Sequence, residues 1–150
     1  MNALIETVLI AQLAATSMMA GVIWIVQLLV YPSFADVAAT VDRREWQQFH
    51  ARHSRRISFV VGPAMIVEAI CALWLLIALP ASIPAALIAS GAGLVAINWA
   101  TTILVSSRHH ARLSSEAEMS CIGQLIAVNW LRTAAWSARF ALAVVMCLVA

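Results

Sequence analysis

Residues 8–30 read VLIAQLAATSMMAGVIWIVQLLV, and this stretch decides the fold because it contains no charged side chain. About 20 consecutive apolar residues are what a helix needs to cross the hydrocarbon core of a bilayer. The charge-free run is longer still, since no ionisable residue lies between Glu6 and Asp36 other than Tyr31. We predict a membrane-spanning helix over 8–30, ended by Tyr31-Pro32 because proline lacks the backbone donor that continues a helix.

Three further apolar stretches follow the first. They cover residues 57–79, 85–105 and 124–148, and Pro80 and Pro84 mark the turn between the first two of them. Short connections favour antiparallel neighbours, and a chain of 150 residues suits one domain. The sequence therefore predicts an all-α integral membrane four-helix up-down bundle, a single domain over 1–150, with helices extending into the cytoplasm.

The polar segment before the second span has helical character of its own. Trp46, Phe49, His53 and Ile57 recur there every three or four residues, which is the spacing of one helix face. We predict an amphipathic cytoplasmic helix over about 42–56. It either extends the second span or lies along the membrane interface.

The composition agrees with a membrane protein. Hydrophobic residues make up 63% of the chain and charged residues 11%, whereas a soluble domain has about 25% charged residues. A net charge of +2 without a basic run argues against nucleic acid as a partner. Cys71, Cys121 and Cys147 form no C-x-x-C pair, which argues against a dithiol redox centre and against a structural zinc site.

The arginines predict the orientation. Five of the nine lie in segment 31–56 and two in segment 106–121, while the Pro80–Pro84 turn and both termini have none. The positive-inside rule places arginine-rich segments in the cytoplasm. We predict a multi-pass protein of the bacterial inner membrane, with the lipid bilayer as its first partner and both termini periplasmic or extracellular.

Each predicted span also carries polar residues. In chain order they are Gln12, Thr16 and Gln27, then Glu68, then Asn98, Thr101 and Thr102, and finally Asn129, Arg132, Trp136 and Arg139. At 100° per residue, those within each span fall on one face, so all four spans can direct polar groups at one centre. Two explanations stay open: interhelical hydrogen bonds at ~0.6 kcal/mol each, or a ligand site.

Glu68, Arg132 and Arg139 are the most informative of these residues, because an unpaired charge at mid-depth costs at least ~2.5 kcal/mol. Their depths predict that Glu68 pairs with Arg139, and less directly with Arg132. The pair is either structural or part of a site that binds a ligand or handles protons.

In the functional alternative, we expect Arg132, Glu68 and Asn129 to be the catalytic residues. Arg132 would stabilise an anionic oxygen of the ligand and Asn129 would orient it. Trp136 would stack on the ligand, and Glu68 would balance Arg139 or move a proton.

The four histidines lie at the predicted cytoplasmic ends of the spans. His50 and His53 share a helix face at i, i+3, and His109-His110 follow the third span. One histidine from each pair could ligate a haem iron, with His50, His53 and His110 as the cofactor-binding candidates alongside Trp136 and Arg139. Solvated interfacial histidines without any cofactor are the alternative, and we predict no other metal site.

The six tryptophans divide into two groups. Trp24, Trp46 and Trp74 suit anchors at the membrane interface. Trp99, Trp130 and Trp136 lie beside Asn98, Asn129 or Arg132, and they either line a flat aromatic pocket or serve packing.

Four motifs resemble those of a large group of uncharacterised four-helix bacterial membrane proteins. They are Trp24-x-x-Gln27-x-x-x-Tyr31-Pro32, Phe49-His50-x-x-His53-x-x-Arg56, Gly62-Pro63-x-Met65-x-x-Glu68 and Asn129-Trp130-x-Arg132-Thr133-x-x-Trp136-x-x-Arg139. The last is also similar to the Asn-x-x-Arg-Thr signature of the anthrone oxygenase-like domain-of-unknown-function family. That resemblance implies oxidation of a flat polycyclic phenol, with Asn129, Arg132 and Trp136 as site residues.

The chain departs from that family at Ile122 and Gly123, where a histidine is expected early in the fourth helix. A second likeness, carried by Val30-Tyr31 and Pro63-Ala64-Met65-Ile66, is to the haem-binding protoporphyrinogen oxidase-type four-helix family. It implies a haem protein. However, that family's first-helix histidine and third-helix lysine are absent, since the chain contains no Lys.

Three functions stay open on the sequence. The one we favour is binding or oxidation of a hydrophobic aromatic or quinone-like small molecule in a polar intramembrane pocket. The second is a haem b or metal-binding membrane protein that uses the cytoplasmic-side histidines, and the third is a non-catalytic subunit of a membrane complex. Small residues such as Gly91 and Gly93 let helices approach closely, so a homo-oligomer is open as well.

Overall fold

The computed structural model describes residues 2–106 and 119–150, and every regular element within those ranges is a helix. This confirms the all-α fold. Four helical stretches of the described chain are long and apolar enough to cross a membrane: Ala3–Thr40, Arg43–Ala78, Ala85–Leu104 and Ile122–Val149. They match the four predicted spans, and the first two extend beyond them.

The first helical stretch continues through the proline that was expected to end it. It consists of α1 (Ala3–Ile25), the π-helical segment η1 (Val26–Val30) and α2 (Tyr31–Thr40). In η1 the backbone N–H of Tyr31 donates to the carbonyl of Val26, five residues earlier. This wider π-helical turn ends just before α2 begins. Pro32 lies in the first turn of α2, where a missing backbone N–H is tolerated. The prediction that Tyr31-Pro32 ends the helix was therefore wrong.

The second stretch, α3, runs without a break from Arg43 to Ala78. Its N-cap is Asp42, whose side chain accepts a hydrogen bond from the Glu45 backbone N–H at 2.8 Å. Leu79 ends it in the left-handed conformation, with φ of 39°. The 36 residues span about 54 Å at 1.5 Å per residue. Segment 42–56 is thus the first part of α3 and not a separate helix.

The third stretch combines α4 (Ala85–Ala100) with a second π-helical segment, η2 (Thr101–Ser106), and the last helix is α6 (Met119–Val149). Both agree with the predicted spans. His109 and His110 lie outside the described residues.

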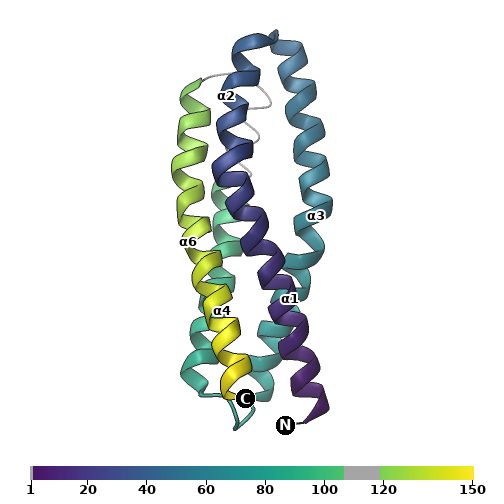
Figure 1. Ribbon diagram of the computed structural model, residues 1–150, viewed down its shortest axis with the longest axis vertical. Coiled ribbons are helices and arrows are strands. Elements are labelled where there is room, and N and C mark those ends of the chain that lie inside the picture. Colours follow the sequence, from purple (N-terminus) through teal and green to yellow (C-terminus); the bar gives the residue numbers. More distant parts are fainter. Residues whose placement is uncertain (1, 107–118) are drawn as a thin grey trace.

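The helices pack side by side along their lengths (Figure 1). α1 contacts both α3 and α6, and α4 contacts both of them as well. Gln12 contacts Met146 and Gln27 contacts Asn129, so α1 and α6 run in opposite directions. Both termini lie at the same end of the bundle as the connection between α3 and α4 (Figure 1).

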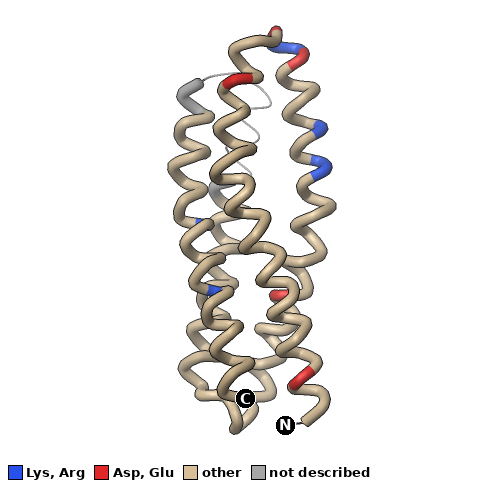
Figure 2. The backbone as a smooth tube through the Cα atoms, viewed as in Figure 1, with Lys and Arg blue, Asp and Glu red and all other residues tan. Residues whose placement is uncertain are grey.

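The outer surface of the bundle is strongly apolar. Large residues such as Ile70, Ile77 and Leu148 are 62%, 76% and 80% exposed. Outside the interior, charged residues of the described chain gather mainly at the end of the bundle where α2 connects to α3, and one acidic position lies at the end that holds both termini (Figure 2). A surface of this kind is a liability in water and suits the interior of a bilayer.

Candidate functional site

The interior of the bundle alternates between apolar and polar layers. Three apolar clusters follow one another along its length, centred on Trp46, on Trp136 and on Leu75. The order of residues on α6 shows this alternation. Asn129 and Arg132 lie between the first cluster, which includes Leu125, and Trp136 of the second. Arg139 lies between Trp136 and Met146 of the third cluster. Two polar layers therefore lie between three apolar ones.

The first polar layer is built around Glu68 of α3, and we call it the Glu68 layer. Glu68 Oε1 accepts hydrogen bonds from Arg139 Nε of α6 at 2.5 Å and from Thr16 Oγ1 of α1 at 3.0 Å. The Glu68 and Arg139 side chains are 0% and 1% exposed. This confirms the predicted pairing of Glu68 with Arg139, and it ties three helices together.

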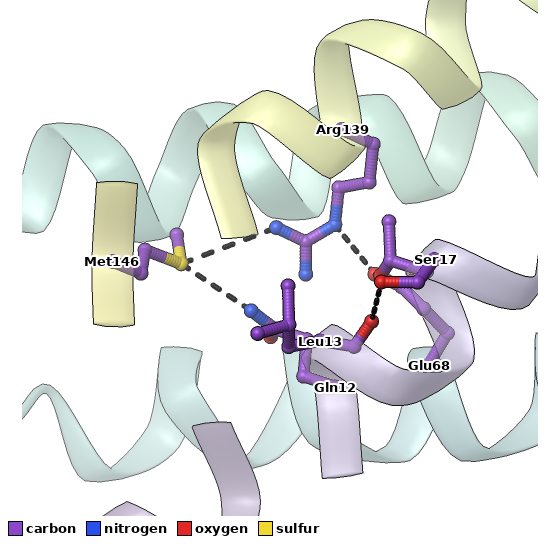
Figure 3. A network of polar contacts seen from close by, with 7 residues as sticks. Gln12, Leu13, Ser17, Glu68, Arg139 and Met146 are labelled. Carbon is purple, nitrogen blue, oxygen red and sulfur yellow. Dashed lines mark hydrogen bonds and ion pairs between the residues drawn. The ribbon is translucent and has the colours of Figure 1, made fainter. Parts of the chain in front are cut away.

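A thioether completes the Glu68 layer. Met146 Sδ accepts from Gln12 Nε2 at 3.4 Å and lies 4.0 Å from Arg139 Nη1, so both polar side chains converge on the sulfur (Figure 3). The backbone of α4 comes close at the same level, because a Cβ added to Gly91 would lie 2.5 Å from Arg139 Nη1. Any larger residue at this position would require the guanidinium of Arg139 to shift.

The second polar layer, the Arg132 layer, joins α1 to α6 through a chain of hydrogen bonds. Gln27 Nε2 donates to the Ile126 carbonyl at 3.3 Å, and Asn129 Nδ2 donates to Gln27 Oε1 at 2.8 Å. Arg132 Nη1 then donates to Asn129 Oδ1 at 3.1 Å. Arg132 is also hydrogen-bonded to the side chain of Tyr31. Arg132 is therefore held by its neighbours and does not pair with Glu68.

Asn98 lies in the last turn of α4, three residues before η2 begins. Its backbone carbonyl accepts from the hydroxyls of Thr101 at 3.1 Å and Thr102 at 2.7 Å. The two threonines thus bond back onto their own helix, a common use of hydroxyl side chains within membrane helices. Among the polar residues predicted to share this helix face, Asn98 is therefore the one whose side chain can bond to another group in the interior of the bundle.

Asn98 and Arg132 lie at about the same depth. Gly91 of α4 lies against Arg139 of α6 at the Glu68 layer. Asn98 is seven residues, or two helical turns, from Gly91, and Arg132 is equally far from Arg139. Seven residues correspond to ~10 Å along a helix, and α4 starts at the end where α6 finishes (Figure 1). Both π-helical segments, η1 and η2, contact α6. Such segments occur frequently at functional sites.

Several buried polar atoms have no hydrogen-bond partner within the described part of the chain. Around the Arg132 layer they are Asn98 Oδ1 and Nδ2, Trp99 Nε1, Arg132 Nε and Trp136 Nε1, and in the Glu68 layer they are Gln12 Oε1 and Glu68 Oε2. A buried polar group without a partner costs about 1–3 kcal/mol. A native interior rarely keeps so many, so each requires an explanation such as water or a ligand.

The structure places the tryptophans of the two predicted groups in different surroundings, and the stacking role of Trp136 stays a prediction. Trp136 is fully buried at the centre of the apolar cluster between the two polar layers. Trp130 lies on the outside, 47% exposed and edge-to-face with Trp24 at 5.8 Å between ring centroids. Trp46 is 0% exposed. The prediction that Trp46 is an interfacial anchor was therefore wrong, because Trp46 packs into an apolar cluster with Phe34 of α2.

The two described histidines belong to an aromatic cluster. His50 stacks on Trp46 with ring centroids 5.8 Å apart, and Phe34 of α2 lies edge-on to both His50 and His53. His50 precedes the apolar part of α3, and burial lowers its pKa to about 4, with the charge of His53 acting in the same direction. His50 is therefore neutral at pH 7.

No group of three His, Cys, Asp or Glu side chains is placed to hold a metal ion among the described residues. His50 and His53 come close to each other on α3, but the third candidate ligand, His110, lies outside the described residues. The haem hypothesis thus stays a prediction from the sequence.

The structure brings Arg132, Asn129 and Trp136 together on one face of α6 and brings Glu68 to Arg139. Asn98, Tyr31 and Gly91 are additions that sequence reasoning did not assign to the site. Asn98 belongs to the predicted polar face and precedes Trp99, so the sequence contains a signal for it. Nothing in the sequence distinguished Gly91 from Gly93.

Comparison with known proteins adds no relative: no protein-family model, curated protein or solved structure matches this chain.

Proposed function

We propose that the chain is a multi-pass membrane protein that binds a hydrophobic aromatic or quinone-like molecule between α4 and α6, at the Arg132 layer. Four apolar helices and an apolar outer surface support the membrane location. We also propose that the chain is an up-down bundle in the bacterial inner membrane. The distribution of arginines supports an orientation with both termini outside and the start of α3 in the cytoplasm.

The observation that carries the ligand proposal is the set of buried polar atoms without partners. Asn98 and Trp136 are 0% exposed and Arg132 is 7% exposed, and each retains at least one unpartnered N–H. These groups come from two helices in contact with each other. A ligand that accepts hydrogen bonds from both helices would remove the cost of leaving them unpaired.

The kind of atom indicates the kind of ligand. Asn98 Nδ2, Arg132 Nε, Trp99 Nε1 and Trp136 Nε1 are donors, and Asn98 Oδ1 is the one unpartnered acceptor among them. Donors in excess favour a ligand with carbonyl or phenolate oxygens. The apolar side chains next to them, Met65 and Ile23 in the Trp136 cluster, favour a ligand whose body is apolar. Quinones and polycyclic phenols have both features.

The hydrogen-bond chain changes the role of Asn129. Both of its side-chain polar atoms are engaged, one with Gln27 and one with Arg132. We therefore assign Asn129 to positioning the guanidinium of Arg132, and Asn98 to contacting the ligand. Arg132 keeps its stabilising role toward an oxygen that carries negative charge.

Glu68 and Arg139 lie one apolar cluster away from this position. Their contacts support a structural role that fixes α3 against α6. The resemblance of the Asn129–Arg132–Thr133 motif to the anthrone oxygenase-like family supports a flat phenolic ligand.

Quenching of tryptophan fluorescence by a bound quinone tests the proposal, because Trp136 and Trp99 border the site. Purified protein in detergent should show saturable quenching with ubiquinone-1 or with an anthraquinone. Asn98→Ala and Arg132→Lys should each weaken binding by about tenfold, the effect of one lost hydrogen bond to a charged or buried partner.

The matched controls are Ser90→Ala on α4 and Gln124→Ala on α6, both exposed positions on the same helices. They should bind as the unchanged protein does. Far-UV circular dichroism establishes that each variant is folded. Equal affinities for all four variants, or no saturable quenching by either probe, would reject the site.

A further inference from the structure

The first part of α3 has two different faces. One face carries Trp46 and His50, both 0% exposed and packed against Phe34. The opposite face is exposed and carries Arg52, Arg55 and Arg56. These arginines stand at i, i+3 and i+4, so they project from one side of the helix.

The same exposed face continues as an apolar strip. At 100° per residue, the residues that follow the three arginines within a sector of about 100° are Phe59, Pro63, Ile66, Ile70, Leu73 and Ile77, all exposed. Phe59 is 72% exposed and comes one turn after Arg56. Three positive charges thus lie at the end of a strip about five turns long that faces away from the bundle.

No acidic side chain among the described residues balances the charges of these arginines. Arg52, Arg55 and Arg56 form no ion pair in the part of the chain that the structure describes. The nearest acidic residue on this face of the helix is Glu45, seven residues before Arg52, or ~10 Å further from the apolar strip. Figure 2 shows the basic positions of α3 in the first part of the helix. The long remainder of α3 carries a single acidic position.

We propose that this face of α3 binds an anionic phospholipid. The headgroup phosphate would lie against Arg52, Arg55 and Arg56, and an acyl chain would lie along the strip that begins at Phe59. Guanidinium groups are matched to phosphate oxygens in geometry and charge, and basic clusters directly beside a membrane span recognise anionic lipids. The inference uses the membrane location proposed above but not the interior ligand site.

Lipid retention measured by native mass spectrometry tests this inference. Protein is incubated in detergent with equal amounts of phosphatidylglycerol and phosphatidylcholine, and the lipids that stay bound are counted. The unchanged protein should retain phosphatidylglycerol in excess. In Arg52→Gln/Arg56→Gln the excess should fall about thirtyfold, because each of the two arginines near a membrane surface contributes about 1 kcal/mol, or about fivefold.

Arg43→Gln/Arg44→Gln is the charge-matched control, since it removes the same net charge at the far end of the helix extension. It should keep the excess, and Arg52→Lys/Arg56→Lys should retain most of it. Equal retention of the two lipids by the unchanged protein would overturn the inference. An equal loss in both Gln pairs would do the same, because it would show attraction to net charge only. Arg132→Lys should leave lipid retention unchanged, so this result is separable from the ligand test.

Discussion

Arg139 of α6 donates to Glu68 of α3 at 2.5 Å inside a bundle that shields both side chains from solvent, at 1% and 0% exposure. The second carboxylate oxygen, Oε2, has no partner within the described residues. One carboxylate oxygen of Glu68 is thus hydrogen-bonded, and the other is not, within the described part of the chain. The energetic role of the pair follows from burial, since each charge is tolerable only because the other is present.

Removing one member of the pair should be more harmful than removing both. Arg139→Met leaves a buried carboxylate without its cation and should lower the free energy of unfolding by about 3–5 kcal/mol. Glu68→Met/Arg139→Met should recover most of that loss. Unfolding in mixed detergent, followed by circular dichroism, measures both. A double variant as unstable as the single one would show that the pair is not the source of the effect.

Gly91 and Gly93 make a matched test of the contact between α4 and Arg139. A Cβ at Gly91 would lie 2.5 Å from Arg139 Nη1 and 3.0 Å from Met146 Cε, whereas nothing lies within 4 Å of a Cβ at Gly93. Gly91→Ala should destabilise by about 1–3 kcal/mol through overpacking. Gly93→Ala should be neutral or stabilise by up to about 1 kcal/mol, because alanine favours helix. Thermal unfolding of the two variants compares them directly, and equal midpoints would contradict the packing seen around Arg139.

Asn98 and Asn129 should respond in opposite ways to the same change. Asn98→Leu replaces an amide without partners by an apolar group, which should leave the ligand-free protein as stable or make it more stable. Asn129→Leu breaks the bonds to Gln27 and Arg132 and should lower the free energy of unfolding by about 1–3 kcal/mol. Denaturation without added ligand separates them. A large loss of stability in Asn98→Leu would show that its amide has a structural partner.

The burial of His50 predicts a dependence of stability on pH. Its pKa is lowered to about 4 in the folded protein, against about 6.5 when unfolded. The unfolded state therefore binds the extra proton first as pH falls. The contribution of neutral His50 to the free energy of unfolding is fully present above pH 6.5. It is lost progressively as the pH falls from 6.5 to 4.

Between pH 7.5 and pH 5, the stability of His50→Gln should fall less than the stability of the unchanged protein. His53, whose pKa burial also lowers, should account for part of the fall that remains. Unfolding midpoints of the two proteins at pH 7.5 and pH 5 provide the comparison. An identical pH dependence with and without His50 would exclude the imidazole as its source.

Much of the fold was predictable because charge and apolarity are so unevenly distributed. Long apolar stretches with few or no charged residues give the four long helices. The 100° spacing of Gln12, Thr16 and Gln27 correctly placed them in the interior. The pairing of Glu68 with Arg139 was predictable for an energetic reason, since a bilayer interior leaves a carboxylate few alternatives.

The parts that were missed depend on contacts between helices or on local backbone adjustment. Pro32 looked like a helix end, but η1 provides a wider turn directly before it. The difference between Gly91 and Gly93 comes from which of them faces Arg139. The difference between Asn98 and Asn129 comes from which has a neighbour to bond, and no pattern within a single helix contains that information.

Photo-crosslinking with an azidoquinone is the most direct test of the interior site. We predict that the label attaches to α4 and α6 around Asn98 and between Arg132 and Trp136, that excess ubiquinone-1 prevents it, and that Asn98→Leu strongly reduces it. Labelling confined to the outward residues of α3 or α6, unaffected by competitor and by Asn98→Leu, would contradict a ligand site at the Arg132 layer.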